Sequence, residues 1–164
     1  MDINFKEAKF EHLPKLLEIY TYYVLNTTAT FHINPPTLSD MQELMFFEEP
    51  RYQTFIILIS EVICGYVILS QFKKREAYDG TAEVTVYLSQ DYIGKGIGGA
   101  AIRFIEKAAS MSGIHTLIAT ICGDNNKSIK AFEVNGFTKC AHYKQVGEKF
   151  GQLLDVVAYQ KIIS

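Results

Sequence analysis

The sequence predicts a mixed α/β (α+β) fold, in which helices flank a mixed, twisted sheet of about seven strands. Runs rich in β-branched and other apolar residues, as at 54–60, 65–71 and 82–88, indicate strands. Apolar residues at three- and four-residue spacing, as at 13–24 and 97–112, indicate amphipathic helices. The order βααβββαβαββ implies one parallel crossover around the helix at 97–112.

The first part of the chain predicts a strand and two helices. A short strand at 3–8 precedes the helix at 13–24, near whose start proline is tolerated. Asn34-Pro35-Pro36 stops any continuation of this helix, and Ser39 offers an N-cap for a second helix that runs to about Glu49. The next two strands, 54–60 and 65–71, are expected to form a hairpin.

The strand at 82–88 has the clearest alternation in the chain. One face carries Ala82, Val84, Val86 and Leu88, and the other carries Glu83, Thr85 and Tyr87. The remaining predicted elements are the helix at 97–112 ending at Gly113, a strand at 115–121, a short helix capped by Asn125 or Asn126 and ended by Gly136, and strands at 137–143 and 153–161.

Bulk properties predict one globular domain over residues 1–164, acting in the cytoplasm. Sixteen basic and 18 acidic residues argue against a nucleic-acid binder, and the longest apolar run, 55–59, is far shorter than the ~20 residues that cross a membrane. The N-terminal sequence lacks the pattern of a signal peptide. Cys64, Cys122 and Cys140 are spaced as neither a disulfide framework nor a metal-binding motif.

A glycine-rich turn, Gly94-Lys95-Gly96-Ile97-Gly98, lies between a predicted strand and a predicted helix. Glycines let a ligand approach the backbone, and the N–H groups and dipole of the helix N-terminus attract an anion. A tight turn with close helix packing is the simpler interpretation. Lys95 is either a solvated charge or a partner for a phosphate.

Two common anion-binding motifs fit this turn poorly. A P-loop requires Ser or Thr after its lysine, and Gly96 follows Lys95. Gly94, Gly96 and Gly99 match the GxGxxG spacing of dinucleotide-binding proteins, with Asp124 as a candidate ribose ligand. That motif belongs to the first unit of a sheet with several parallel strands, whereas one helix and two strands remain here. An NAD(P)-binding oxidoreductase is therefore a remote alternative.

The turn also resembles the cofactor motif of the GNAT N-acetyltransferases, in particular the phosphinothricin and methionine sulfoximine acetyltransferase branch. Matching stretches follow one another in the order expected for this branch. They are Asn26-Thr27-Thr28-Ala29-Thr30-Phe31, Thr81 to Tyr87, Ile93 to Gly98, Asn125-x-x-Ser128-Ile129, Asn135-Gly136-Phe137, and Val146 to Gly151 with Leu154-Asp155. The resemblance implies the GNAT fold and an acetyl-CoA-dependent N-acetyltransferase.

The resemblance places acetyl-CoA between the strand that ends at Leu88 and the strand that starts near His115. Asn125 is expected to contact the cofactor, to cap a helix, or to do both. The implied cofactor-binding residues are Val86, Tyr87 and Leu88 through their backbone, Ile93, Gly94, Lys95, Gly96, Ile97 and Gly98 around the pyrophosphate, and Asn125. Relatives usually have Arg or Gln where this chain has Ile93, so the backbone N–H groups must provide most of the contacts.

The chemistry requires a proton acceptor, because an amine is largely protonated at neutral pH. The resemblance implies Glu83 as the base, with a solvated surface carboxylate as the alternative, and His142 as a proton relay or substrate ligand, with a half-buried strand histidine as the alternative. Many relatives carry Tyr or His, as an acid, where this chain has Phe132. Tyr143 or water are substitutes that the sequence leaves open.

The resemblance implies a small amino-acid-like amine as acceptor, bound by Phe31, Lys73, Tyr78 and Thr85. Lys73 stands where relatives have an arginine, and lysine does not reproduce a bidentate clamp on a carboxylate. Transfer to another amine, such as a peptide or polyamine, and an acetyl-CoA-binding module with little catalysis are the alternatives. A homodimer is expected, with the segment 146–151 near the interface.

Overall fold

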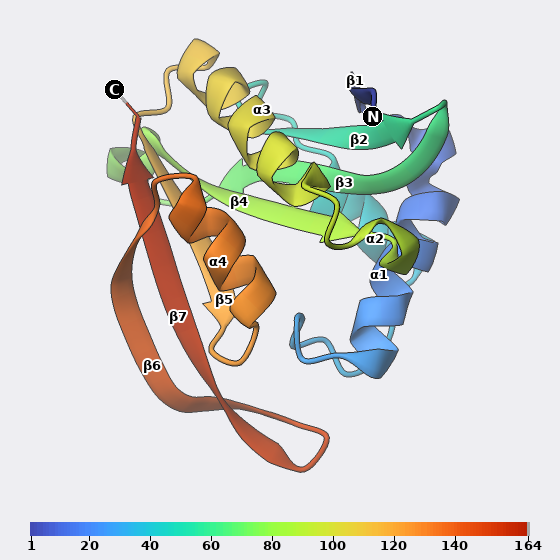
Figure 1. Ribbon diagram of the computed structural model, residues 1–164. Coiled ribbons are helices and arrows are strands. Elements are labelled where there is room, and N and C mark those ends of the chain that lie inside the picture. Colours follow the sequence, from blue (N-terminus) through green and yellow to red (C-terminus); the bar gives the residue numbers. More distant parts are fainter. Residues whose placement is uncertain (164) are drawn as a thin grey trace.

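The computed structural model describes residues 1–163, whose seven strands form one sheet in the order β1-β2-β3-β4-β5-β7-β6 (Figure 1). The strands are β1 (Ile3–Glu7), β2 (Gln53–Ile59), β3 (Val62–Gln71), β4 (Thr81–Leu88), β5 (Thr116–Cys122), β6 (Thr138–Lys149) and β7 (Gln152–Ile162). The helices are α1 (Leu13–Asn26), α2 (Leu38–Met45), α3 (Ile97–Met111) and α4 (Asn126–Val134). The element order matches the predicted βααβββαβαββ, and the parallel pair is β4 with β5.

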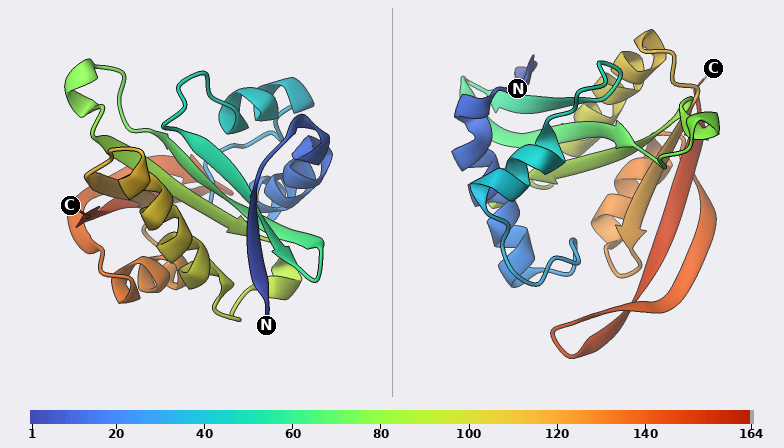
Figure 2. Two further views of the ribbon diagram at one scale, coloured as in Figure 1. Left: turned by 90° about the horizontal axis from the view of Figure 1, so that it is seen from above. Right: turned by 180° about the vertical axis from the view of Figure 1, so that it is seen from behind.

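The helices cover both faces of the sheet (Figure 2). Each face has its own core of buried residues. On one face, α3 buries Ile97, Ile102 and Ile105 against Ala82 and Val84 of β4. On the other face, α1 and α2 bury a second cluster that includes Leu16, Val24, Met41 and Met45. The alternation predicted for β4 is confirmed, because Ala82 and Val84 belong to the first cluster whereas Tyr87 packs against the second.

Element boundaries differ from the predictions at four places. Helix α2 ends at Met45 rather than near Glu49, and β6 continues to Lys149 rather than ending at residue 143. Helix α2 begins after Thr37 rather than Ser39, because the Thr37 hydroxyl accepts from the Asp40 N–H at 3.1 Å and the Asp40 carboxylate accepts from the Thr37 N–H at 3.0 Å. The β2–β3 hairpin is tighter than predicted. Ser60 and Glu61 both take positive φ, which fits a two-residue turn and lets β3 begin at Val62.

Strands β4 and β5 diverge after a short parallel contact. Only Thr81–Glu83 of β4 pair with Thr116–Ile118 of β5. Beyond this point β4 stays paired with β3, while β5 stays paired with β7 through Cys122. The carboxyl ends of the two strands are therefore separated within the sheet, and Figure 1 shows β4 and β5 running apart. Ligands commonly bind at the carboxyl ends of parallel strands.

Candidate active site

The edge of β4 that faces the divergence carries unpaired backbone groups. The Ser89 N–H donates to the Cys64 carbonyl of β3 at 2.8 Å, so every second residue of β4, including Tyr87, directs its N–H toward β3. By the same alternation, Val86 and Leu88 direct theirs toward the opening. The Tyr23 hydroxyl of α1 donates to the Leu88 carbonyl. An extended ligand can pair with the backbone of Val86 and with the N–H of Leu88 as an added strand. The Leu88 carbonyl is engaged by Tyr23, and the backbone of Tyr87 is engaged by β3.

The glycine turn has the geometry of an anion site. Gly94 and Gly96 have φ values of 79° and 80°, a region that favours glycine. A Cβ at either position would meet no atom within 4 Å, so this turn is open rather than packed. Within residues 1–163, no protein group accepts a hydrogen bond from the backbone N–H groups of residues 94–99. These N–H groups, at the start of the 15-residue helix α3, suit a pyrophosphate.

The other residues expected around the cofactor flank this turn. Ile97 and Gly98 form the first turn of α3, and Ile93 is half-buried before it. Lys95 is exposed, with its Nζ 5.7 Å from the centre of the Tyr92 ring. Asn125 caps α4, since its Oδ1 accepts from the Ser128 N–H at 3.3 Å. The free N–H groups and the open edge of β4 fit a pyrophosphate and an extended thiol-bearing chain, so the site fits acetyl-CoA.

Glu83 is the last residue of β4 that pairs with β5, at the point where the two strands begin to diverge. Its side chain is half-buried on the sheet face that α1 and α2 cover, opposite the face of Ala82 and Val84. Burial raises the pKa of the Glu83 carboxyl, and a hydrogen bond with the Thr120 side chain of β5 acts in the opposite direction. A carboxylate with a raised pKa beside an opening suits general-base chemistry near neutral pH.

His142 lies on the opposite face of the sheet from Glu83. It pairs with Val157 of β7, which belongs to the same buried cluster as Ala82 and Val84. Its Nε2 lies 2.8 Å from an Asp155 carboxylate oxygen, at the outer strand pair. The structure therefore does not bring His142 together with Glu83, and the two cannot form a relay within one chain. Side chains alternate between the two faces of the sheet along each strand. In the observed register β4 presents Glu83 to one face, whereas β6 presents His142 to the other.

The residues expected to bind the acceptor are dispersed. Thr85 lines a pocket of about 330 Å³ between α2 and strands β3 and β4. Phe31 instead packs against Gly147 of β6, where a Cβ would come within 2.3 Å of the Phe31 ring. Lys73 lies outside the pocket lining, with its Nζ 5.4 Å from the centre of the Tyr78 ring. Of the four, only Thr85 therefore lines this pocket.

A segment that sequence reasoning did not single out in this role, residues 27–33, connects the two halves of the sheet. On one side the Tyr87 hydroxyl donates to the Ala29 carbonyl at 3.3 Å. On the other side the buried ammonium of Lys149 donates to the Thr30 carbonyl at 2.7 Å. The Thr28 hydroxyl also donates to Asp124, at 2.9 Å. The stretch Asn26 to Phe31 carries part of the family resemblance, but no periodicity reveals that it spans from β4 to β6.

Phe132 offers no hydroxyl to the site. It is buried in the core and packs edge-on against Phe137, with ring centres 5.0 Å apart. Tyr143 shares the face of Glu83 through its pairing with Val156, and it is largely exposed. No group of three or more potential metal-ligating side chains occurs within residues 1–163. None of the helices described is both long enough and apolar enough to span a membrane.

Comparisons with known proteins agree with this geometry. The acetyltransferase (GNAT) domain family matches residues 7–158. The L-methionine sulfoximine/L-methionine sulfone acetyltransferase of Pseudomonas paraeruginosa is 31% identical over 164 residues, covering 98% of this chain and 94% of the relative. The L-amino acid N-acyltransferase MnaT of Escherichia coli is 30% identical, covering 98% and 92%.

A solved structure adds the cofactor. The GNAT phosphinothricin acetyltransferase from Sinorhizobium meliloti, in complex with acetyl-CoA, superposes with a TM-score of 0.93 at 30% identity, covering 99% of this chain and 89% of that one. The match spans both halves of the divergent sheet and the glycine turn between them. The chain belongs to the GNAT family of acetyltransferases, enzymes that use acetyl-CoA.

Proposed function

We propose that this enzyme transfers an acetyl group from acetyl-CoA to the primary amine of a small amino-acid-like acceptor, by direct transfer with both substrates bound. The observation that supports this most strongly is the position of Glu83 at the point where β4 and β5 diverge, near the backbone of Val86 and the N–H of Leu88, which face the opening. Relatives named for methionine sulfoximine, methionine sulfone and L-amino acids support the acceptor class.

In this proposal each group has a defined task. The N–H groups of residues 94–99 bind the pyrophosphate, and Val86 and Leu88 pair with the pantetheine chain. Acetyl-CoA, when bound, supplies the thioester carbonyl that the acceptor amine attacks. The C–N bond forms, the C–S bond breaks, and the coenzyme A thiolate leaves and takes the second amine proton through water. Glu83 takes a proton from the acceptor's ammonium, directly or through one water, so that a neutral amine is available. His142 has no part in this step, because it lies on the other face of the sheet.

The test is release of free coenzyme A thiol with a panel of amines. Methionine sulfone, methionine sulfoximine, phosphinothricin, other amino acids, polyamines and a peptide cover the acceptor classes. We expect turnover with amino acids and little with polyamines or peptides. Absence of turnover with every amine, while calorimetry shows acetyl-CoA binding, would favour a binding module instead.

The proposal includes a homodimer formed through the β6–β7 hairpin. The hairpin extends away from the rest of the sheet in Figure 1 and carries exposed apolar side chains, namely Tyr143, Val146, Phe150 and Leu153. Phe150 is 59% exposed, and clustered exposed apolar residues favour a protein interface. We expect a dimer by light scattering and a monomer after Phe150→Glu. A wild-type monomer at micromolar concentration would contradict this part of the proposal.

A cytoplasmic location is also part of the proposal. Cys64, Cys122 and Cys140 are all unpaired, as in proteins of reducing compartments. Fractionation of cells that express the tagged protein would test the location.

A further inference from the structure

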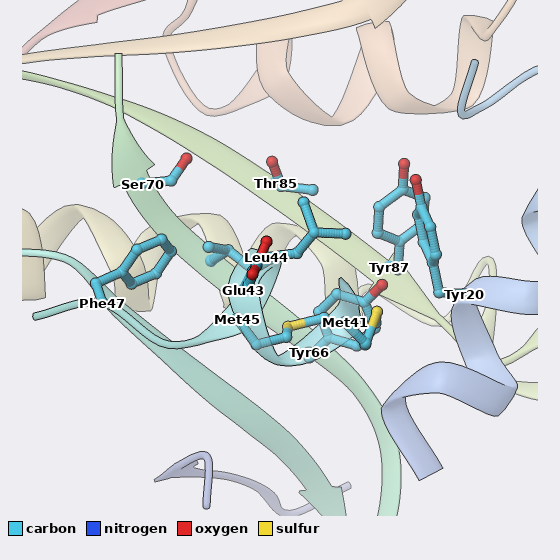
Figure 3. Close-up of a pocket in the computed structure, with 11 residues that line it drawn as sticks. Tyr20, Met41, Glu43, Leu44, Met45, Phe47, Tyr66, Ser70, Thr85 and Tyr87 are labelled. Carbon is cyan, nitrogen blue, oxygen red and sulfur yellow. The ribbon is translucent and has the colours of Figure 1, made fainter. Parts of the chain in front are cut away.

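The pocket beside Glu83 has a composition that bears on the acceptor. Figure 3 shows its lining side chains, which come from α1, α2, β3, β4 and the segment after α2. Its floor is formed by Met41, Met45 and Tyr66, each at most 2% exposed. Glu43 and Leu44, which are exposed on α2, form part of its rim. The volume of about 330 Å³ is enough for an amino-acid side chain but small for a peptide.

The pocket begins next to the proposed base. Ser70 of β3 lines the pocket and is the direct cross-strand partner of Glu83. Thr85 also lines it and lies two residues beyond Glu83, on the same face of β4. An acceptor whose amine meets Glu83 can therefore extend its side chain into this pocket.

The charge that lines the pocket is negative. Glu43 is the one charged residue among the lining residues within the described part of the chain, and no lysine or arginine joins it there. Lys73, the basic residue that the resemblance implies for the acceptor, does not line the pocket, and its Nζ lies over the rings of Phe72 and Tyr78. An anionic side chain would lose hydration on the apolar floor without gaining a cationic partner.

We infer, on the basis of the proposed function, that the pocket binds an uncharged acceptor side chain of about methionine size and disfavours an anionic one, with Glu43 as a specificity-determining residue. The thioethers of Met41 and Met45 suit a flexible apolar chain. The hydroxyls of Ser70 and Thr85 can donate to a neutral oxygen such as that of a sulfone.

Methionine sulfone and phosphinothricin test this inference, because they are similar in size and differ in side-chain charge. We expect wild-type kcat/KM to favour the sulfone by at least about tenfold, an effect of the size that a like charge and lost hydration give. Glu43→Gln should raise kcat/KM for phosphinothricin about threefold to tenfold and leave that for the sulfone within about twofold. Glu43→Lys should raise the phosphinothricin value further.

Glu48→Gln is the matched control, since Glu48 is an exposed acid close in sequence that does not line the pocket. It should leave the ratio of the two acceptors unchanged. A wild-type preference for phosphinothricin, or a ratio that neither Glu43 variant alters, would overturn the inference. If no amine is acetylated, that result contradicts the proposed function but does not test the charge selection. Calorimetric binding of the two acceptors to the protein loaded with coenzyme A then decides the same question, with equal affinities overturning the charge selection.

Discussion

Removing the Tyr66 hydroxyl should stabilise the protein. Within the described residues this hydroxyl is buried, exposes less than 1 Å², and has no hydrogen-bond partner. Burial raises the pKa of Tyr66 well above its usual range, so the group stays neutral. An unpaired buried hydroxyl costs about 1–3 kcal/mol. Tyr66→Phe removes it without changing the shape of the ring, so we expect a gain of about 1 kcal/mol, equivalent to roughly 2–4 °C in Tm for a chain of this size.

Urea denaturation and thermal unfolding of the wild type and Tyr66→Phe measure this gain. Tyr20→Phe provides the matched control, because the Tyr20 hydroxyl bonds to Thr30 Oγ1 at 2.6 Å and also contacts His32. We expect this control to lose about 1 kcal/mol. If Tyr66→Phe were destabilised as much as Tyr20→Phe, the Tyr66 hydroxyl would have a partner and the reasoning would fail.

Three further substitutions test the site. Thr120→Val should raise the pKa of Glu83 further, because it removes the side-chain hydrogen bond that opposes the effect of burial. The acidic limb of the kcat/KM–pH profile should then move to higher pH, and Thr120→Ser should restore the wild-type profile. Gly96→Ala should weaken coenzyme A binding in calorimetry, since a side chain at φ 80° costs about 1–2 kcal/mol in the turn. His142→Ala should keep kcat within about threefold, and a loss of 100-fold would return His142 to the mechanism.

Much of the fold could be predicted from local pattern. The alternation of apolar residues at 82–88 and their spacing at 97–112 predict which side chains are buried in the core, and both predictions are confirmed. The start of α2 was missed because Thr37 and Ser39 are both acceptable caps by type. Only the reciprocal bonds between Thr37 and Asp40 distinguish them.

The site was less predictable, because it depends on contacts between distant segments. The glycine turn is local, and its two positive φ values agree with the predicted anion site. The face to which His142 belongs depends on the β6–β7 register, which shifts on both sides of this residue and which no residue pattern reveals. The contact of Phe31 with Gly147 and the bond from Lys149 to Thr30 join residues more than 100 positions apart.

The most direct test of the account is the single-turnover acetylation rate of Glu83→Gln, measured with saturating acetyl-CoA and the best acceptor from the amine panel. Saturation removes any effect on cofactor affinity, and glutamine keeps the size and hydrogen-bonding capacity of the side chain while losing the base. We predict a fall of about 10²–10⁴-fold, the usual contribution of a general base. A rate within a few-fold of the wild type would contradict the role of Glu83 as the proton acceptor.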